Sequence, residues 1–227
     1  MEYFTLNNGH KMPMAGIGVF LLKPEETELS VLSALADGIR LIDTANAYMN
    51  EKAVGRAIAK SGVAREDIFL VTKLWPTVYT DENAVDETLA RLGTDYVDLL
   101  FLHQPAGDWR TGYKMMEKAY KEGKVKALGL SNFPIEWLKE IIETAEIKPQ
   151  MVQVEAHPYF PQTELKKVLA ETGMGLMAWY PLGHGDKNLI NEPVFTKLAE
   201  KYGKSPYGEH LRRVAQGKYT ASFNKNR

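Results

Sequence analysis

Short apolar segments rich in Val, Ile and Leu alternate along most of the chain with longer segments of helical periodicity. Apolar runs of this kind are typical of parallel strands that are buried on both faces. Regular strand–helix units predict an α/β fold, either a closed (β/α)8 barrel or a doubly wound open sheet. The predicted strands are 16–20, 39–44, 68–73, 96–102, 126–130, 151–155 and 175–179. The predicted helices are 25–37, 51–60, 81–92, 112–122, 134–146, 161–171 and 192–202.

Polar residues of unusual type follow the predicted strands, and they favour the barrel, the TIM-barrel architecture, over the open sheet. Enzymes with this architecture carry their chemistry at the carboxyl ends of the strands. The segment Gly16-Ile17-Gly18 lacks the third glycine of a dinucleotide-binding fingerprint, which argues against a Rossmann domain. Before the first strand, Asn8-Gly9 between short apolar segments predicts a β-hairpin over residues 3–13.

The composition excludes several functional classes. The 227 residues carry a formal net charge of −1, so no basic field attracts nucleic acid or an anionic membrane. No apolar run approaches the length of a membrane span. The absence of cysteine excludes disulfides and thiolate metal sites, and no histidine pair has metal spacing. We expect a cytoplasmic enzyme that acts on a small molecule and holds no metal.

The sequence changes in character after Lys204. Residues 205–227 show little periodicity and no Val/Ile run, so no eighth strand or eighth helix is recognisable. We therefore expect an incomplete barrel over 1–204 followed by a divergent tail over 205–227. Open edges on the first and seventh strands would favour association of the chain.

Four residues at three successive strand ends suggest catalysis: Asp43, Tyr48, Lys73 and His103. A phenol has a pKa near 10, and a cation about 4 Å away stabilises its anion by roughly 4 kcal/mol at an effective dielectric of about 20. Lys73 is thus expected to lower the pKa of Tyr48 toward the range of a general acid, while Asp43 keeps Lys73 charged. The alternative is that Asp43 and Lys73 form only a buried ion pair, but this leaves Tyr48 and His103 without a role.

Six ordered motifs carry a family resemblance. They are Gly38-x-Arg40-x-x-Asp43-Thr44-Ala45-x-x-Tyr48-x-Asn50-Glu51, Thr72-Lys73-Leu74-Trp75, Leu102-His103-x-Pro105, Gly129-x-Ser131-Asn132-Phe133, Gln153-x-Glu155-x-His157-Pro158 and Pro181-Leu182-Gly183. Over about residues 3–204 the chain resembles the aldo-keto reductases, in particular the prokaryotic 2,5-diketogluconate reductase and glyoxal reductase-like members. The resemblance implies a (β/α)8 barrel that reduces an aldehyde or ketone with NADPH, or with NADH as the other candidate, and that is monomeric.

The resemblance also implies roles for further residues. Those expected to bind the cofactor are Ser131, Asn132, Gln153, Trp179, Leu182 and Gly183. Those expected to line the substrate pocket are Phe20, Trp75 and Gln104, with Trp109 a weaker candidate. The family's groups for the 2′-phosphate follow its eighth strand, where this sequence shows no match. We therefore expect weak discrimination between NADPH and NADH.

Two alternatives remain open on the sequence alone. One is an inactive, truncated barrel that acts at most as a weak cofactor-binding or interaction module. The other is a lyase that forms a Schiff base through Lys73.

Overall fold

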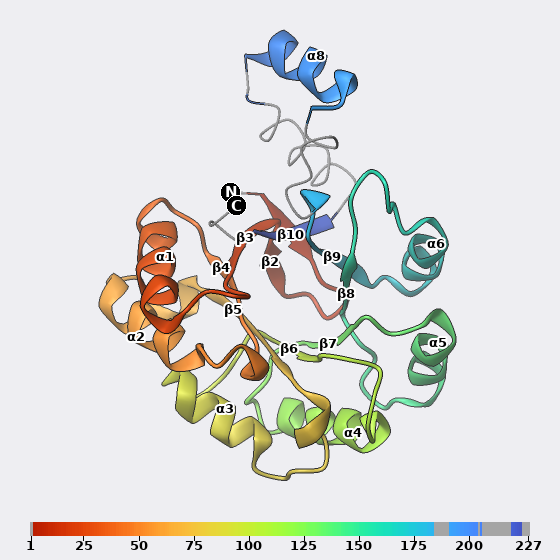
Figure 1. Cartoon of the computed structure of the whole chain (residues 1–227). Coiled ribbons are helices and arrows are strands. Elements are labelled where there is room, and N and C mark those ends of the chain that lie inside the picture. Colours follow the sequence, from red (N-terminus) through yellow and green to blue (C-terminus); the bar gives the residue numbers. More distant parts are fainter. Residues whose placement is uncertain (1, 184–190, 204, 206–218, 224–227) are drawn as a thin grey trace.

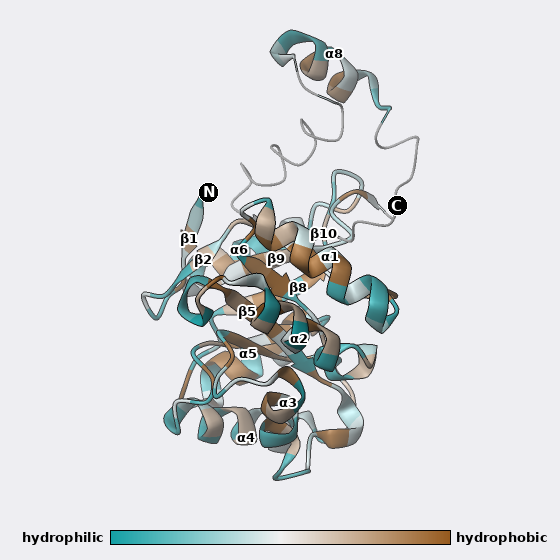
Figure 2. Cartoon of the chain, turned by 90° about the vertical axis from the view of Figure 1, so that its left-hand side faces the viewer, coloured by the Kyte–Doolittle hydropathy of each residue, from teal (hydrophilic) through white to brown (hydrophobic). Residues whose placement is uncertain are grey.

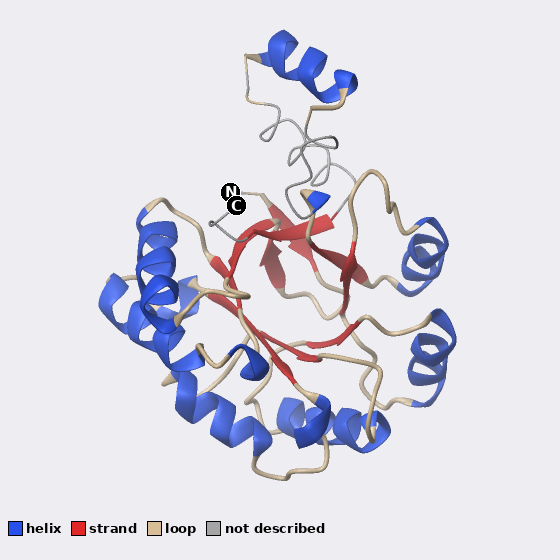
Figure 3. Cartoon of the chain, viewed as in Figure 1, coloured by secondary structure: helices blue, strands red, loops and turns tan. Residues whose placement is uncertain are grey.

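A ring of parallel strands forms the centre of the molecule, and helices cover its outer face (Figures 1 and 3). The structure is a computed structural model that describes residues 2–183, 191–203 and 205, and the backbone of 219–223. The strands of the ring, in spatial order, are β10 Tyr219–Phe223, β3 Ala15–Gly18, β4 Leu41–Asp43, β5 Phe69–Leu74, β6 Leu99–Leu102, β7 Leu128–Ser131, β8 Met151–Glu155 and β9 Gly175–Trp179. The barrel is closed, because β10 pairs with both β9 and β3.

Helices alternate with these strands, as the sequence predicts. They are α1 Pro24–Ala36, α2 Glu51–Ser61, α3 Ala84–Leu92, α4 Trp109–Lys121, α5 Ile135–Thr144, α6 Thr163–Thr172 and α8 Pro193–Tyr202. Three short 3-10 turns, η1 Asn46–Tyr48, η2 Arg65–Asp67 and η3 Pro76–Val78, lie in the loops. Figure 2 shows apolar and polar residues alternating along the helices, as expected where one side packs on a sheet. Helix α8 lies outside the ring in both views (Figures 1 and 2).

The predicted N-terminal hairpin is confirmed. Strands β1 Tyr3–Thr5 and β2 Lys11–Pro13 pair antiparallel in a separate sheet. Leu6 and Met12 of this hairpin belong to the core cluster inside the barrel, together with Val71, Phe101 and Met177. The hairpin therefore closes the end of the barrel at which the parallel strands begin.

The closing strand β10 is a difference from the sequence expectation. The sequence indicates no eighth strand, because Tyr219-Thr220-Ala221-Ser222-Phe223 lacks the Val/Ile run of the other strands. In the structure this segment pairs Ala221 with Ala15 on one side and with Ala178 on the other. The edges of β3 and β9 are therefore paired, which removes the reason for expecting association through an open barrel. Residues 206–218 and 224–227 of the expected tail lie outside the described residues.

Candidate active site

Three charged or polar side chains line the inner face of the barrel where the strands end. Successive residues of a strand point to opposite faces, so residues two apart share a face. Leu41, Val71 and Phe101 belong to the core inside the barrel. The residues two positions further along the chain are Asp43, Lys73 and His103. The alternation of the strands thus brings these three side chains together at the open end of the barrel.

Lys73 is the central group of the cluster. Its side chain is 1% exposed, and its ammonium donates to Asp43 Oδ1 at 2.5 Å, the Thr44 carbonyl at 2.8 Å and Tyr48 Oη at 3.3 Å. These three acceptors match the three N–H donors of an ammonium group. Burial alone would lower the pKa of Lys73, but the charges and hydrogen bonds of Asp43 and Tyr48 together outweigh burial and raise this pKa above its ordinary value. Lys73 therefore stays charged.

Tyr48 ends the turn η1 and lies against Lys73. Because Lys73 donates to the phenol oxygen, the hydroxyl hydrogen of Tyr48 is left to point away from the ammonium. Burial raises the pKa of Tyr48, and the charge of Lys73 opposes this without overcoming it. The sequence predicts a lowered pKa for Tyr48. The structure differs because desolvation of the buried phenol, which the sequence does not reveal, exceeds the effect of Lys73. In this structure the phenol is protonated at neutral pH.

His103 is a neutral imidazole. Burial, assisted by the charge of Lys73, lowers the pKa of His103 to about 3. Its ring lies edge-on to Tyr48, with 5.6 Å between the ring centroids, and to Trp75, at 5.0 Å. His103 Nδ1 is buried and has no hydrogen-bond partner among the described residues. An unpaired buried nitrogen is costly unless a ligand or water pairs with it.

Gln153 reaches the same cluster from β8. Its amide nitrogen donates to Asp43 Oδ2 at 3.1 Å and contacts Met177 Sδ at 3.3 Å. Both carboxylate oxygens of Asp43 are therefore held, one by Lys73 and the other by Gln153. One expected cofactor residue is therefore in direct contact with Asp43, one of the four expected catalytic residues.

The other residues expected to hold a cofactor lie at the ends of neighbouring strands. Ser131 closes β7, is 1% exposed and pairs in register with Gln153 of β8. The Trp179 indole N–H donates to Asn132 Oδ1 at 2.8 Å, so each side chain fixes the orientation of the other. Leu182 and Gly183 lie in the loop after β9, where Gly183 donates its N–H to the Tyr180 carbonyl. Hydroxyl, amide and aromatic groups at adjoining strand ends, beside the unpaired His103 Nδ1, fit the amide and the ring of a nicotinamide.

Two partly exposed aromatic side chains, Phe20 and Trp75, lie on the solvent side of the cluster, and the opening between them is called the mouth of the site. Phe20 is 40% exposed, with its ring 4.9 Å from that of Tyr48, and Trp75 is 37% exposed beside His103. Gln104 follows His103, but the hydrogen bonds seen for it are made by its backbone, with the hydroxyl of Tyr79 and the N–H of Ala106. Trp109 does not line this mouth, since it is 3% exposed and stacks on Trp137 between the helices.

Sequence reasoning missed several polar residues that support the cluster. Asn50 and Glu51 are each 1% exposed, and Asn46 contacts the loop after β5. Asn50 and Glu51 stand in a motif that carries the family resemblance, so their positions were visible, but their contacts across the fold were not. The sequence feature that could have drawn attention to Asn46 and Asn50 is their spacing, since each lies two residues from Tyr48.

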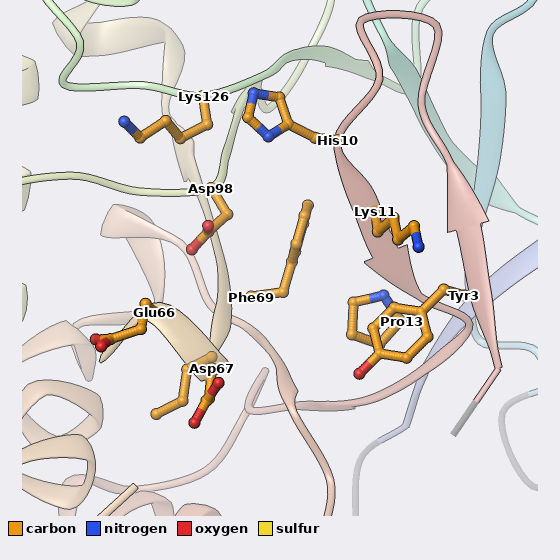
Figure 4. A pocket seen from close by; sticks show the side chains of 10 residues that line it. Tyr3, His10, Lys11, Pro13, Glu66, Asp67, Phe69, Asp98 and Lys126 are labelled. Carbon is orange, nitrogen blue, oxygen red and sulfur yellow. The ribbon is translucent and has the colours of Figure 1, made fainter. Parts of the chain in front are cut away.

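A second depression lies at the opposite end of the barrel, beside the hairpin (Figure 4). It has a volume of about 260 Å³, and Lys126 and His10 lie on one side of Phe69 while Glu66 and Asp67 lie on the other. Lys126, Glu66 and Asp67 carry charges of both signs, and none of these residues is buried, unlike the cluster at the strand ends. Within the described residues, no group of three His, Cys, Asp or Glu could hold a metal ion, and no helix is long and apolar enough to cross a membrane.

Comparison with known proteins agrees with this geometry. Residues 20–217 match the model of the Aldo/keto reductase family. The chain belongs to the aldo/keto reductase family. As a member of this family it is an oxidoreductase that acts on carbonyl groups.

Individual relatives of this aldo-keto reductase agree with the assignment. An aldo-keto reductase of Mycolicibacterium smegmatis is 44% identical over 212 residues, which cover 89% of this chain and 75% of the relative. A glyoxal reductase of Bacillus subtilis is 43% identical over 206 residues, covering 88% of this chain and 74% of the relative. The crystal structure of an aldo/keto reductase from Brucella melitensis superposes with a TM-score of 0.93 at 36% identity, covering 99% of this chain and 88% of that chain.

Backbone strain in this aldo-keto reductase is concentrated around the same site. Among the described residues, five that are not glycine have positive φ: Leu21, Met49, Asn132, Gln162 and Tyr180. All five lie in loops that follow the carboxyl ends of barrel strands, after β3, β4, β7, β8 and β9 in turn. Strain of this kind costs about 1–3 kcal/mol a residue and persists where the surrounding structure fixes the backbone.

Proposed function

We propose that this chain reduces an aldehyde or ketone to an alcohol with a nicotinamide cofactor, NADPH by expectation and NADH as the other candidate. The observation that carries the proposal is the contact between Lys73 and Tyr48, in which the ammonium donates to the phenol oxygen at 3.3 Å. This contact leaves the hydroxyl hydrogen of Tyr48 available to a substrate. A protonated phenol beside a fixed cation is a proton donor whose anion is stabilised as it forms.

The reaction divides between cofactor and protein. The reduced nicotinamide, when bound, supplies a hydride, which is one hydrogen with two electrons, to the carbonyl carbon. Tyr48 gives its proton to the carbonyl oxygen, and the phenolate that remains is stabilised by Lys73. Asp43 keeps Lys73 charged and in place through the 2.5 Å ion pair. The neutral imidazole of His103 carries one N–H, with which it orients the carbonyl oxygen toward Tyr48.

The cofactor would be held by residues from β7, β8 and the loop after β9. Ser131, Asn132 and Gln153 offer the hydroxyl and amide groups that a carboxamide needs, and Trp179 offers a ring face. Leu182 and Gly183 would lie along the pyrophosphate. The groups named for the nicotinamide are common to NADPH and NADH, so they do not distinguish the two cofactors.

The pocket favours carbonyl compounds with an apolar body. Phe20 and Trp75 expose apolar rings at the mouth, and we propose that Gln104 adds a polar contact. Exposed apolar surface around a few polar groups is typical of small-molecule sites.

A Schiff-base lyase fits the site less well. Schiff-base formation needs a neutral amine, whereas Asp43 and Tyr48 together outweigh burial and raise the pKa of Lys73. The ammonium also has its three N–H groups paired and a side-chain exposure of 1%.

The proposal is tested with the purified full chain. NADPH and NADH are titrated by the quenching of protein fluorescence, and loss of cofactor absorbance is then followed with a small and an aromatic aldehyde. We expect saturable binding and a rate that depends on the aldehyde. Binding without turnover of any aldehyde or ketone would favour the inactive-barrel alternative, and borohydride trapping of a substrate adduct on Lys73 would favour the lyase.

A further inference from the structure

Two asparagines stand symmetrically around Tyr48 in the chain, each two residues away from it. Asn46 begins η1, and Asn50 immediately precedes α2. Neither contacts the Tyr48 hydroxyl or Lys73 through any hydrogen bond seen here. Each bonds instead to a different neighbouring loop, across 29 residues for Asn46 and up to 31 residues for Asn50.

Asn50 holds the loop between β3 and α1. Its amide nitrogen donates to the carbonyls of Val19 at 2.8 Å and Leu22 at 3.2 Å, and it also lies 3.2 Å from Thr27 Oγ1. Its amide oxygen accepts from Thr44 Oγ1 at 2.9 Å. Val19 and Leu22 bracket Phe20, so the amide of Asn50 fixes both sides of the residue that forms one wall of the mouth.

The contacts of Asn50 also connect it to the catalytic cluster, through Thr44. Thr44 gives its hydroxyl to Asn50, and its carbonyl accepts from Lys73 at 2.8 Å. A buried asparagine without these partners would carry unpaired polar atoms, each costing about 1–3 kcal/mol. This cost favours the positions of the loops after β3 and β4 in which the amide of Asn50 is fully paired.

Asn46 holds the loop after β5. Its side-chain oxygen accepts from the Trp75 backbone N–H at 3.0 Å. Trp75 is the other wall of the mouth, with its ring 5.0 Å from that of His103. The Tyr48 loop is thus bonded to the Phe20 loop on one side and to the Trp75 loop on the other.

We propose that Asn46 and Asn50 are positioning residues that fix the separation of Phe20 and Trp75 around Tyr48, and so limit the size of the carbonyl substrate. The effect on substrates rests on the proposed reductase function. The two sets of hydrogen bonds that join the Tyr48 loop to the Phe20 and Trp75 loops, here called the clamp, are a property of the free protein. A fixed separation favours a compact aldehyde, because both walls contact it while its oxygen lies at Tyr48. Loosening one wall costs the compact aldehyde its orientation and admits a bulkier one.

Substitution of Asn46 gives the sharpest test, because this residue is only partly buried and the fold is expected to survive. Asn46→Ala removes the acceptor for the Trp75 N–H, whereas Asn46→Asp keeps an oxygen at the same place. Asn8→Ala is the matched control, since Asn8 Nδ2 donates to the Lys126 carbonyl at 3.0 Å at the far end of the barrel. For the other arm, Asn50→Ala is compared with Thr27→Val, which removes a hydroxyl from the same cluster and serves if Asn50→Ala does not fold.

The first measurement is amide hydrogen exchange in the free protein, which needs neither cofactor nor substrate. In Asn46→Ala, exchange in residues 75–78 should become about ten-fold faster or more, corresponding to roughly 1.4 kcal/mol of lost protection. Asn46→Asp and Asn8→Ala should leave it unchanged. For the Asn50 arm, faster exchange is expected in residues 19–22. Unchanged exchange in both loops would overturn the clamp.

The second measurement is kcat and KM for a three-carbon aldehyde and for a bulky aromatic aldehyde. In Asn46→Ala, the ratio of kcat/KM for the bulky aldehyde to that for the small one should rise about three- to ten-fold, mainly through KM. Asn46→Asp should restore the ratio of the unmodified chain. An unchanged ratio despite faster exchange would overturn the role in substrate size. If the unmodified chain reduces neither aldehyde, the proposed function fails, and hydrogen exchange alone decides whether the clamp exists.

Discussion

At the scale of single residues, the functional state of the site depends on which groups burial allows to be charged. Lys73 remains an ammonium because Asp43 and two further acceptors hold it. Burial raises the pKa of Tyr48 and lowers that of His103 to about 3, so both of these groups are neutral at physiological pH. One cation, one carboxylate and two neutral donors are the charge states that a carbonyl reductase requires.

Replacing Tyr48 by Phe tests the proton donor. Tyr48→Phe removes only the hydroxyl, so we expect the turnover rate to fall by about 10²-fold or more while cofactor affinity stays within about two-fold. Steady-state kinetics and a fluorescence titration measure the two quantities. Tyr113→Phe is the control, because it removes another buried hydroxyl, which donates to the Ile147 carbonyl at 2.9 Å, far from the site. A Tyr48→Phe rate above about a tenth of normal would exclude Tyr48 as the general acid.

The low pKa of His103 predicts a dependence of stability on pH. The unfolded chain binds a proton at His103 below its ordinary pKa of 6.5, while the folded chain binds it only near pH 3. Protonation therefore favours unfolding, and stability falls as the pH drops from about 6.5 toward 3, by up to about 1.4 kcal/mol per pH unit. Urea unfolding at several pH values measures this slope, which His103→Gln should reduce. An identical slope in the variant would show that His103 titrates normally.

At the scale of elements, a buried carboxylate connects α2 to its two neighbours. Glu51 begins α2 and accepts from Thr72 Oγ1 of β5 at 2.6 Å and from Arg91 Nε of α3 at 2.7 Å. Thr72 directly precedes Lys73 in the chain. The first turn of α2 is therefore fixed against the strand that carries the ammonium, and Arg91 balances a charge that burial disfavours.

Removing Arg91 should destabilise this junction. Arg91→Met leaves Glu51 buried without its ion-pair partner, at an expected cost of about 2–3 kcal/mol at pH 7, since Arg91 is itself 31% exposed. Burial already raises the pKa of Glu51 above the ordinary value of 4.5, and the substitution should raise it further. A raised carboxyl pKa means that stability is lost as the pH rises, so the defect should shrink when the pH is lowered from 7 toward 5.

Two further variants distinguish loss of the Arg91–Glu51 ion pair from loss of the packing of the Arg91 side chain. Glu51→Gln together with Arg91→Met should recover most of the stability, because no buried charge remains unpaired. Arg110→Met removes an exposed pair with Glu140 and should cost less than about 1 kcal/mol. A pH-independent defect in Arg91→Met, with no recovery in the double variant, would assign the loss to the arginine side chain's packing.

Elements of strong periodicity could be predicted from the sequence, and their ends less well. The strands 151–155 and 175–179 coincide with β8 and β9, because each is a short, mostly apolar run between two segments of helical periodicity. Helix α3 was expected to begin at Asp81, but it begins at Ala84, because Asp81 Oδ1 accepts from the Asn83 N–H in a turn before the helix. Local side-chain bonds of this kind compete with helix formation, and periodicity does not reveal them.

The candidate site, too, could be predicted from the sequence only in part. The positions of Asp43, Lys73 and His103 followed from strand ends and motifs, and the structure brings them together with Tyr48. The direction of the pKa of Tyr48, and the bonds made by Asn46 and Asn50, depend on burial and on contacts between distant residues. A single sequence without a fold contains neither quantity.

At the scale of the whole molecule, closure of the barrel depends on its least strand-like segment. Residues 219–223 carry no Val or Ile, yet β10 pairs with both β3 and β9. Every other barrel strand is identifiable from its own composition, whereas β10 is defined by the two edges that it joins. The expectation of an incomplete barrel followed from judging this segment alone.

A proline in β10 tests whether closure matters to the molecule. Ala221 is paired on both sides, with Ala15 and with Ala178, so Ala221→Pro removes a backbone N–H from a strand that has two neighbours. We expect a loss of about 3 kcal/mol or more in stability and, because the edges of β3 and β9 become available, association that increases with protein concentration. Thermal unfolding and light scattering coupled to size exclusion measure these effects. Ala221→Gly keeps the N–H and should cost only about 1 kcal/mol with no association. If Ala221→Pro behaved like Ala221→Gly, the pairing of β10 would be dispensable, and the seven remaining parallel strands would be sufficient for a stable, unassociated fold.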